Sequence, residues 1–106
     1  MTREAVRIWL SSRTPAPPAA LATKLHQCLD GAPDATFAGG SLAEIAGRLG
    51  VATLRAAVER QNAGSEAAAM DLLAADAFVT YAFEAASDGG EDVAALVRRL
   101  LVEVPA

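Results

Sequence analysis

The chain has 106 residues, a net charge of −4 at pH 7 and an apolar share of 53%, of which little is aromatic. This is the length of one domain, and folding at this size hides about 60–70% of the unfolded surface, so a core needs neither metal nor disulfide. The acidic balance disfavours broad nucleic-acid binding, and the single cysteine, Cys28, excludes an internal disulfide. We therefore expect one globular domain, residues 1–106, in a reducing cytoplasm.

Neither the start of the chain nor its most apolar stretch has the pattern of a targeting or membrane segment. Charges within residues 3–7 interrupt the apolar run that a signal peptide needs. The most apolar stretch, residues 67–86, contains Asp71, Asp76 and Glu84. Each of these acids costs about 2–3 kcal/mol or more near the centre of a bilayer, so we expect no membrane partner.

The first two helices are separated by prolines. We predict a helix over residues 2–12, with Thr2 as its N-cap. The prolines of residues 14–18 disfavour helix before them and suit the first turn of the next one, so this stretch is a stiff connector. The second helix is predicted over residues 18–30, with Gly31 as its C-terminal cap. Its buried stripe consists of Leu21, Leu25, Cys28 and Leu29.

A long loop leads into the third predicted helix. We expect Phe37 to fold back from this loop onto the core. The letters "SLAE" at residues 41–44 match a capping box, in which a hydroxyl caps the helix and a glutamate follows three residues later. The apolar face of this helix changes side after Gly50. We therefore predict a bend or break near Gly50, followed by helix to about Gln61.

Residues 41–60, "SLAEIAGRLGVATLRAAVER", resemble a helix-turn-helix of the kind found in bacterial transcription regulators. The positions that carry the resemblance are Leu42, Ile45, Ala46, Leu49, Gly50, Val51, Leu54, Arg55 and Val58. In that family the second helix enters the major groove, which would implicate Thr53, Arg55 and Arg60 in DNA contacts. The segment departs from the pattern in having few residues after the turn and few polar side chains in the second helix. A DNA-binding regulator is the alternative hypothesis.

The last two helices are predicted over residues 66–86 and 91–104. On a helical wheel, residues 66–86 are apolar on two adjoining faces, and only a narrow strip that includes Asp76 and Glu84 is polar. A helix that is apolar nearly all round is buried nearly all round. We therefore expect it to be central, enclosed by the rest of the chain or by a second copy.

No group of residues has the pattern of a catalytic or metal site. Asp76 and Glu84 lack the Glu-x-x-His segments of helical di-metal sites, and we expect them to be solvated or paired with Arg98 and Arg99. The only histidine, His26, lies two positions from the cysteine on a helix, so the two side chains do not face each other. We predict no enzyme activity, no catalytic residue, no metal and no cofactor.

The sequence thus predicts an all-α, single-domain bundle of five to six helices around a central hydrophobic helix at about 66–86. The predicted function is a small protein–protein interaction or structural module that self-associates, for example as a homodimer with a twofold axis. The candidate contacts, chosen because they extend the apolar surface, are Phe78, Tyr81, Leu100 and Val104.

Overall fold

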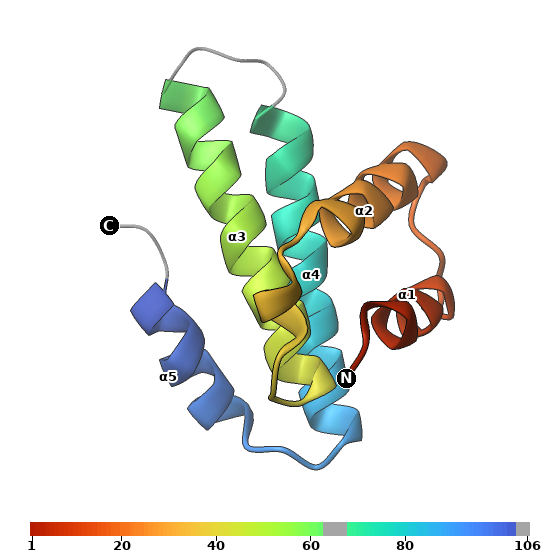
Figure 1. Cartoon of the computed structure of the whole chain (residues 1–106), viewed down its shortest axis with the longest axis vertical. Helices are drawn as coiled ribbons and strands as arrows, with labels where there is room; N and C mark the ends of the chain where they lie inside the picture. Colours follow the sequence, from red (N-terminus) through yellow and green to blue (C-terminus); the bar gives the residue numbers. More distant parts are fainter. Residues whose placement is uncertain (63–67, 104–106) are drawn as a thin grey trace.

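The computed structural model describes residues 1–62 and 68–103 as helices joined by short connections, with no strand in these ranges (Figure 1). The elements in chain order are α1 (Arg3–Ser11), α2 (Ala19–Gly31), the 3₁₀ helix η1 (Asp34–Phe37), α3 (Leu42–Asn62), α4 (Ala68–Asp88) and α5 (Val93–Glu103). The predicted all-α single domain with five α-helices is confirmed.

An antiparallel hairpin of α3 and α4 is the spine of the domain, and these two helices share the most extensive contact. Figure 1 shows α1 and α2 against one side of this hairpin and α5 against the other. The first core cluster lies under α1 and α2 and contains Val6, Leu10, Leu25, Leu29, Phe37, Ile45, Leu49, Ala74 and Phe78. The second core cluster lies under α5 and contains Ala43, Ala46, Val51, Ala82, Ala86, Leu96 and Leu100.

The predicted break near Gly50 does not occur, because α3 is one continuous helix. Its apolar residues change side because α3 faces both core clusters: Ile45 and Leu49 point into the first, and Val51 into the second. Gly50 lies where α3 and α4 approach closely. A Cβ atom added there would lie 2.9 Å from a methyl carbon of Val79, so the glycine permits the contact between the two helices.

We predict that Gly50→Leu destabilises the domain by about 1–3 kcal/mol, because the added side chain forces α3 and α4 apart. Urea unfolding followed by circular dichroism measures this loss. The matched control is Gly31→Leu at the end of α2, where an added Cβ meets nothing within 4 Å. An equal loss in both variants would contradict the packing role of Gly50.

The prediction of one enclosed central helix is not supported. On α4, Leu72 and Leu73 are 42% and 55% exposed, so the neighbouring helices leave part of its apolar surface in contact with water. α3 is buried on at least as many sides, and the core is centred on the α3–α4 pair. The all-round apolar pattern of α4 therefore exceeds what residues 1–62 and 68–103 cover.

The hydroxyl caps predicted at Thr2 and Ser41 are confirmed by hydrogen bonds, whereas the glutamate half of the capping box does not form, because Glu44 pairs with Arg48 and Arg99. The hydroxyl of Thr2 accepts from the backbone N–H of Ala5 at 3.0 Å, and the hydroxyl of Ser41 accepts from that of Glu44 at 3.2 Å. The cap predicted at Gly31 is shifted, because Gly31 is the last residue of α2 and the following alanine is its C-cap. These local hydrogen bonds set where α1 and α3 begin.

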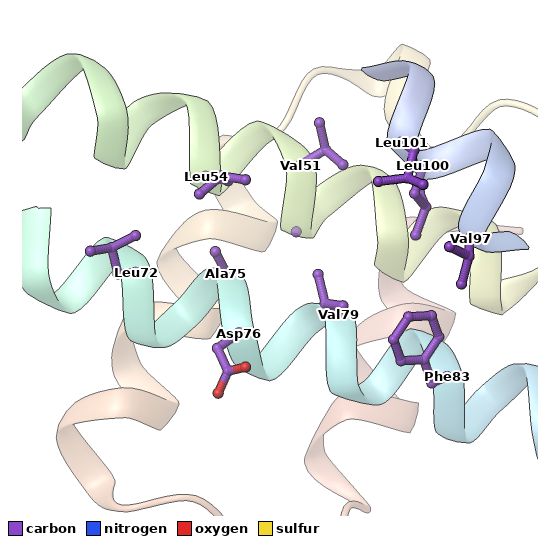
Figure 2. Close-up of a pocket in the computed structure, with 11 residues that line it drawn as sticks. Val51, Leu54, Leu72, Ala75, Asp76, Val79, Phe83, Val97, Leu100 and Leu101 are labelled. Carbon is purple, nitrogen blue, oxygen red and sulfur yellow. The ribbon is translucent and has the colours of Figure 1, made fainter. Parts of the chain in front are cut away.

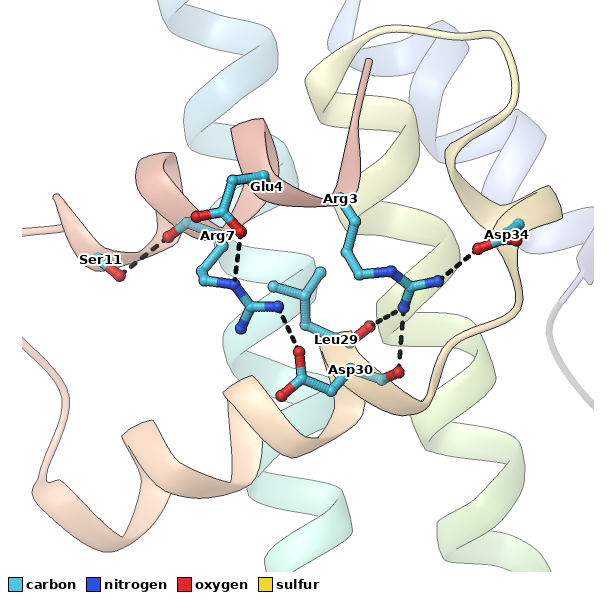
Figure 3. A network of polar contacts seen from close by, with 7 residues as sticks. All are labelled: Arg3, Glu4, Arg7, Ser11, Leu29, Asp30 and Asp34. Carbon is cyan, nitrogen blue, oxygen red and sulfur yellow. Dashed lines mark hydrogen bonds and ion pairs between the residues drawn. The ribbon is translucent and has the colours of Figure 1, made fainter.

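Arginines of α1 fasten this helix to the end of α2 (Figure 3). Arg3 donates to the backbone carbonyls of Leu29 and Asp30 at 2.6 and 3.1 Å. Arg7 pairs with the carboxylates of Asp30 and Glu4. The Arg3 guanidinium satisfies carbonyl groups that every helix leaves unpaired at its C-terminus, so these cations serve the fold.

Candidate functional site, an apolar groove between α3, α4 and α5

An apolar groove of about 390 Å³ runs along α4, between α3 and α5 (Figure 2). Its lining residues are Gly50, Val51, Leu54, Leu72, Ala75, Asp76, Val79, Phe83, Val97, Leu100 and Leu101. Asp76 is the only charged residue among them. A concave surface with large apolar side chains and a single carboxylate at its edge is suited to binding an apolar partner.

Two glycines of α3 allow the neighbouring helices to approach closely around the groove. Gly50 lets α4 approach, and Gly47 does the same for α5, since a Cβ atom on Gly47 would lie 2.6 Å from a methyl carbon of Leu100. On α4, Leu72, Val79 and Phe83 recur at helical spacing and project along the same side. The groove therefore follows from a pattern of small and large side chains on three helices.

The two ends of the groove differ in how they are covered. Figure 2 shows Val97 of α5 beside Phe83, whereas Leu72 lies at the other end, beyond α5, and the Asp76 carboxylate lies at the edge of the groove and points away from α3. We call these the covered half and the open half. The open half exposes apolar surface that α5 of the same chain does not reach.

The outward side of α5 is also apolar. Leu101 and Val102 are 64% and 85% exposed, and Arg98 lies between them on the surface of α5, because it is three positions from one and four from the other. Leu101 is on the side of the groove, and Val102 is on the side of Glu44 and Arg99. We call Arg98, Leu101 and Val102 the outer stripe of α5. The domain thus presents an apolar groove and, beside it, an apolar stripe that carries one positive charge.

A buried ion cluster lies elsewhere, where α2, α3 and α4 meet. Asp71 is only 2% exposed, and its carboxylate lies 2.6 Å from Lys24 Nζ and 3.1 Å from Arg60 Nη1. The Arg60 contact lacks hydrogen-bond alignment, so it is an ion pair only. Sequence reasoning set Asp71 aside, because both cations come from other helices and no local spacing reveals them. The cluster links three helices in the fold.

Tyr81 is held within its own chain. Its ring meets that of Trp9 edge to face, with 6.0 Å between the ring centroids, and the Arg13 guanidinium lies over Trp9 at 4.3 Å. Glu84 pairs with Arg13 at 3.8 Å, not with Arg98 or another residue of α5 as the sequence suggested. These contacts attach α1 to the side of α4 that faces away from the groove lining.

Burial raises the pKa of Tyr81 above the usual 10.0, the negative charge of Glu84 raises it further, and Arg13 lowers it in part. Because the chain has a single tyrosine, an ultraviolet titration of tyrosinate reports this residue alone. We predict a midpoint above 10.0 in the folded protein, and one near ~10 in denaturant. Since the unfolded chain loses this proton first, the contribution to stability is complete below pH 10.0 and is lost as pH rises through the shifted pKa.

The variant Glu84→Gln tests the electrostatic part of this shift, and its midpoint should move down towards 10.0. A folded-state midpoint at or below 10.0 in the unmodified protein would contradict the packing of Tyr81 against Trp9.

The residues predicted to mediate self-association lie in different environments. Phe78 is 1% exposed and belongs to the first core cluster, so it offers no surface to a partner and is removed from the predicted interface. Leu100 is 9% exposed and lines the groove, and Tyr81 packs on Trp9. Val104 lies outside the described residues. Exposed apolar residues of α4 and α5, such as Leu72, Leu101 and Val102, were missed, because their exposure depends on how the neighbouring helices pack.

The helix-turn-helix geometry is absent from residues 41–60, because they lie in one helix and the segment before it, without an internal turn. Thr53 is buried, and its hydroxyl donates to the carbonyl of Leu49 at 2.7 Å. Arg60 is paired with the buried aspartate of α4. Arg55 is exposed on the same helix and has contacts of its own. The structure does not bring these three side chains together on a recognition surface.

The single cysteine, Cys28, is a free, half-buried thiol that packs against the first core cluster. Within residues 1–62 and 68–103, no group of three or more histidine, cysteine, aspartate or glutamate side chains is arranged to hold a metal ion. The helices of this part of the chain are also too short or too polar to cross a membrane.

The fold and the groove define a small all-helical domain with a helical-hairpin core and one open apolar face. Comparison of the chain with models of protein families, with curated proteins and with solved structures finds no match.

Proposed function

We propose that the protein is an interaction module without catalytic activity that self-associates, and that the groove between α3, α4 and α5 is its interface. The observation that carries this proposal is the exposure of large apolar side chains on and beside the groove, 42% for Leu72, 64% for Leu101 and 85% for Val102. Exposed apolar side chains that line a groove, as Leu72 and Leu101 do, are typical of a binding surface.

A second copy of the chain is the partner that fits this face. A twofold dimer requires a surface that is complementary to itself, and this face combines a concave open half with the projecting outer stripe of α5. Association would cover the exposed side of α4, including Leu72. The apolar pattern of α4 predicts a helix that is enclosed on most sides, and in the dimer the two chains together would enclose it.

Sedimentation equilibrium from low to high micromolar concentration tests the proposal. We expect a concentration-dependent dimer that Leu101→Glu weakens by tenfold or more, because burying one leucine contributes about 1.5–3 kcal/mol and a buried glutamate adds a desolvation cost. The matched control is Ile8→Glu on α1, since Ile8 is 65% exposed, as Leu101 is at 64%, but lies away from the groove. A wild-type monomer at all concentrations, or equal losses in both variants, would contradict the proposed interface.

A further inference from the structure

We propose that, in this dimer, α5 of each copy lies over the open half of the other copy's groove, and that Arg98 of one copy pairs with Asp76 of the other. The inference rests on the proposed self-association and specifies which elements meet and in what register. It is carried by two unpaired opposite charges on the two surfaces that the dimer brings together.

Asp76 and Arg98 differ from the other charged groups around them. On α4, Glu84 is paired with Arg13, and on α5, Arg99 lies 3.4 Å from the carboxylate of Glu44. In the part of the chain that the structure describes, neither Asp76 nor Arg98 forms an ion pair, and both are exposed. Asp76 lies at the edge of the open half, and Arg98 lies on the outer stripe of α5. The open half of the groove thus carries an unpaired negative charge, and the outer stripe of α5 carries an unpaired positive charge.

A twofold axis can satisfy both surfaces at once. The groove is covered by α5 at the end near Phe83 and open at the end near Leu72 (Figure 2). If the axis lies in the plane of the interface and crosses the groove near its middle, rotation brings α5 of the second copy over the open half of the first. The same rotation places the first copy's α5 over the second copy's open half, as an isologous interface requires.

The spacing within α5 fits this arrangement. Leu101 lies three positions after Arg98 and on the groove side of α5, so its side chain can enter the groove while the guanidinium stays at the edge. Asp76 is at the edge of the partner groove. An ion pair at the edge mainly fixes register and orientation, whereas the leucine contributes most of the apolar contact.

Charge reversal with a double-mutant cycle tests the inference by sedimentation equilibrium. We expect Asp76→Arg and Arg98→Asp each to weaken the homodimer by about tenfold, because each places like charges opposite one another twice in the dimer. The double variant should regain the wild-type dissociation constant to within about threefold. An equimolar mixture of the two single variants should form a mixed dimer, because both of its pairs have opposite charges.

The control is Arg99→Asp, whose side chain is paired within its own chain. It should show no coupling to Asp76→Arg. A wild-type protein that stays monomeric overturns both the proposed function and this inference. A wild-type dimer in which the double variant is no better than the single ones, and in which the mixture forms no mixed dimer, overturns the inference alone. Circular dichroism of each variant checks that the helices are retained.

Discussion

Replacing Phe78 by alanine is expected to lower the free energy of unfolding by about 3–5 kcal/mol. Phe78 is 1% exposed and lies in the first core cluster, where side chains of α1, α2, α3 and η1 meet the middle of α4. Truncation leaves a cavity at the place where most elements converge, and the surrounding helices relax into it only in part. Urea denaturation at low micromolar protein concentration measures the loss as a shift of the unfolding midpoint.

The comparison variant is Leu72→Ala, on the same helix but 42% exposed and in the open half of the groove. It should cost the monomer less than about 1 kcal/mol, because a side chain that is partly in water loses little on truncation, while it weakens self-association. Phe78→Ala should act on folding, with no separate effect on the dimer once the domain is folded. A similar loss of monomer stability in the two variants would contradict the assignment of Phe78 to the core.

The second large effect is expected for Asp71→Asn, which should destabilise the domain by about 3 kcal/mol, at the low end for breaking a buried ion pair. Asp71 is 2% exposed and is the shared anion of Lys24 and Arg60. Removing its charge leaves the Lys24 ammonium, on a side chain that is only 19% exposed, without a counter-charge, although the amide oxygen of asparagine still accepts a hydrogen bond. The Arg60 side chain is 47% exposed and can turn to water, which limits the loss.

Two further variants separate charge from packing at this cluster. Asp71→Leu combined with Lys24→Met should recover most of the loss, since replacing a buried ion pair by apolar groups of similar volume is often neutral or stabilising. Asp88→Asn, at the exposed end of α4, should change stability by less than about 0.5 kcal/mol. If Asp71→Asn proved as harmless as Asp88→Asn, the cluster would not contribute to the fold.

The helices themselves could be predicted from the sequence because their signals are local. Caps such as Thr2 and Ser41 act within one turn, and Phe37 folds back onto the core as expected from its place in a polar loop. The error at Gly50 also has a physical reason. A change of apolar face along a helix has two explanations, a break or burial on two sides, and only the packing of α3 between two core clusters decides between them.

The polar contacts could not be predicted, because they join residues that are far apart in the chain. Arg13 reaches Glu84 across the α1–α4 contact, and Lys24 reaches Asp71 across the contact of α2 with α4. Helical spacing places each residue on a face but does not state which helix that face meets. For the same reason the sequence assigned Glu84 to cations of α5.

The candidate site was predicted in part. The apolar pattern of residues 66–86 predicted a helix enclosed by its own chain or by a second copy, and Leu100, one of the predicted contacts, lines the groove. The residues Leu72 and Leu101 became candidates only when the packing of α5 over one half of the groove was known, because exposure depends on how neighbouring helices are arranged.

The most direct test of self-association through the groove is an isotope-filtered nuclear Overhauser experiment on a mixture of labelled and unlabelled chains, which detects only contacts between copies. We expect contacts from the methyl groups of Leu101 in one copy to those of Leu54 and Leu72 in the other. Intermolecular contacts confined to another face, such as that of Ile8, or no such contacts at high micromolar concentration, would contradict it.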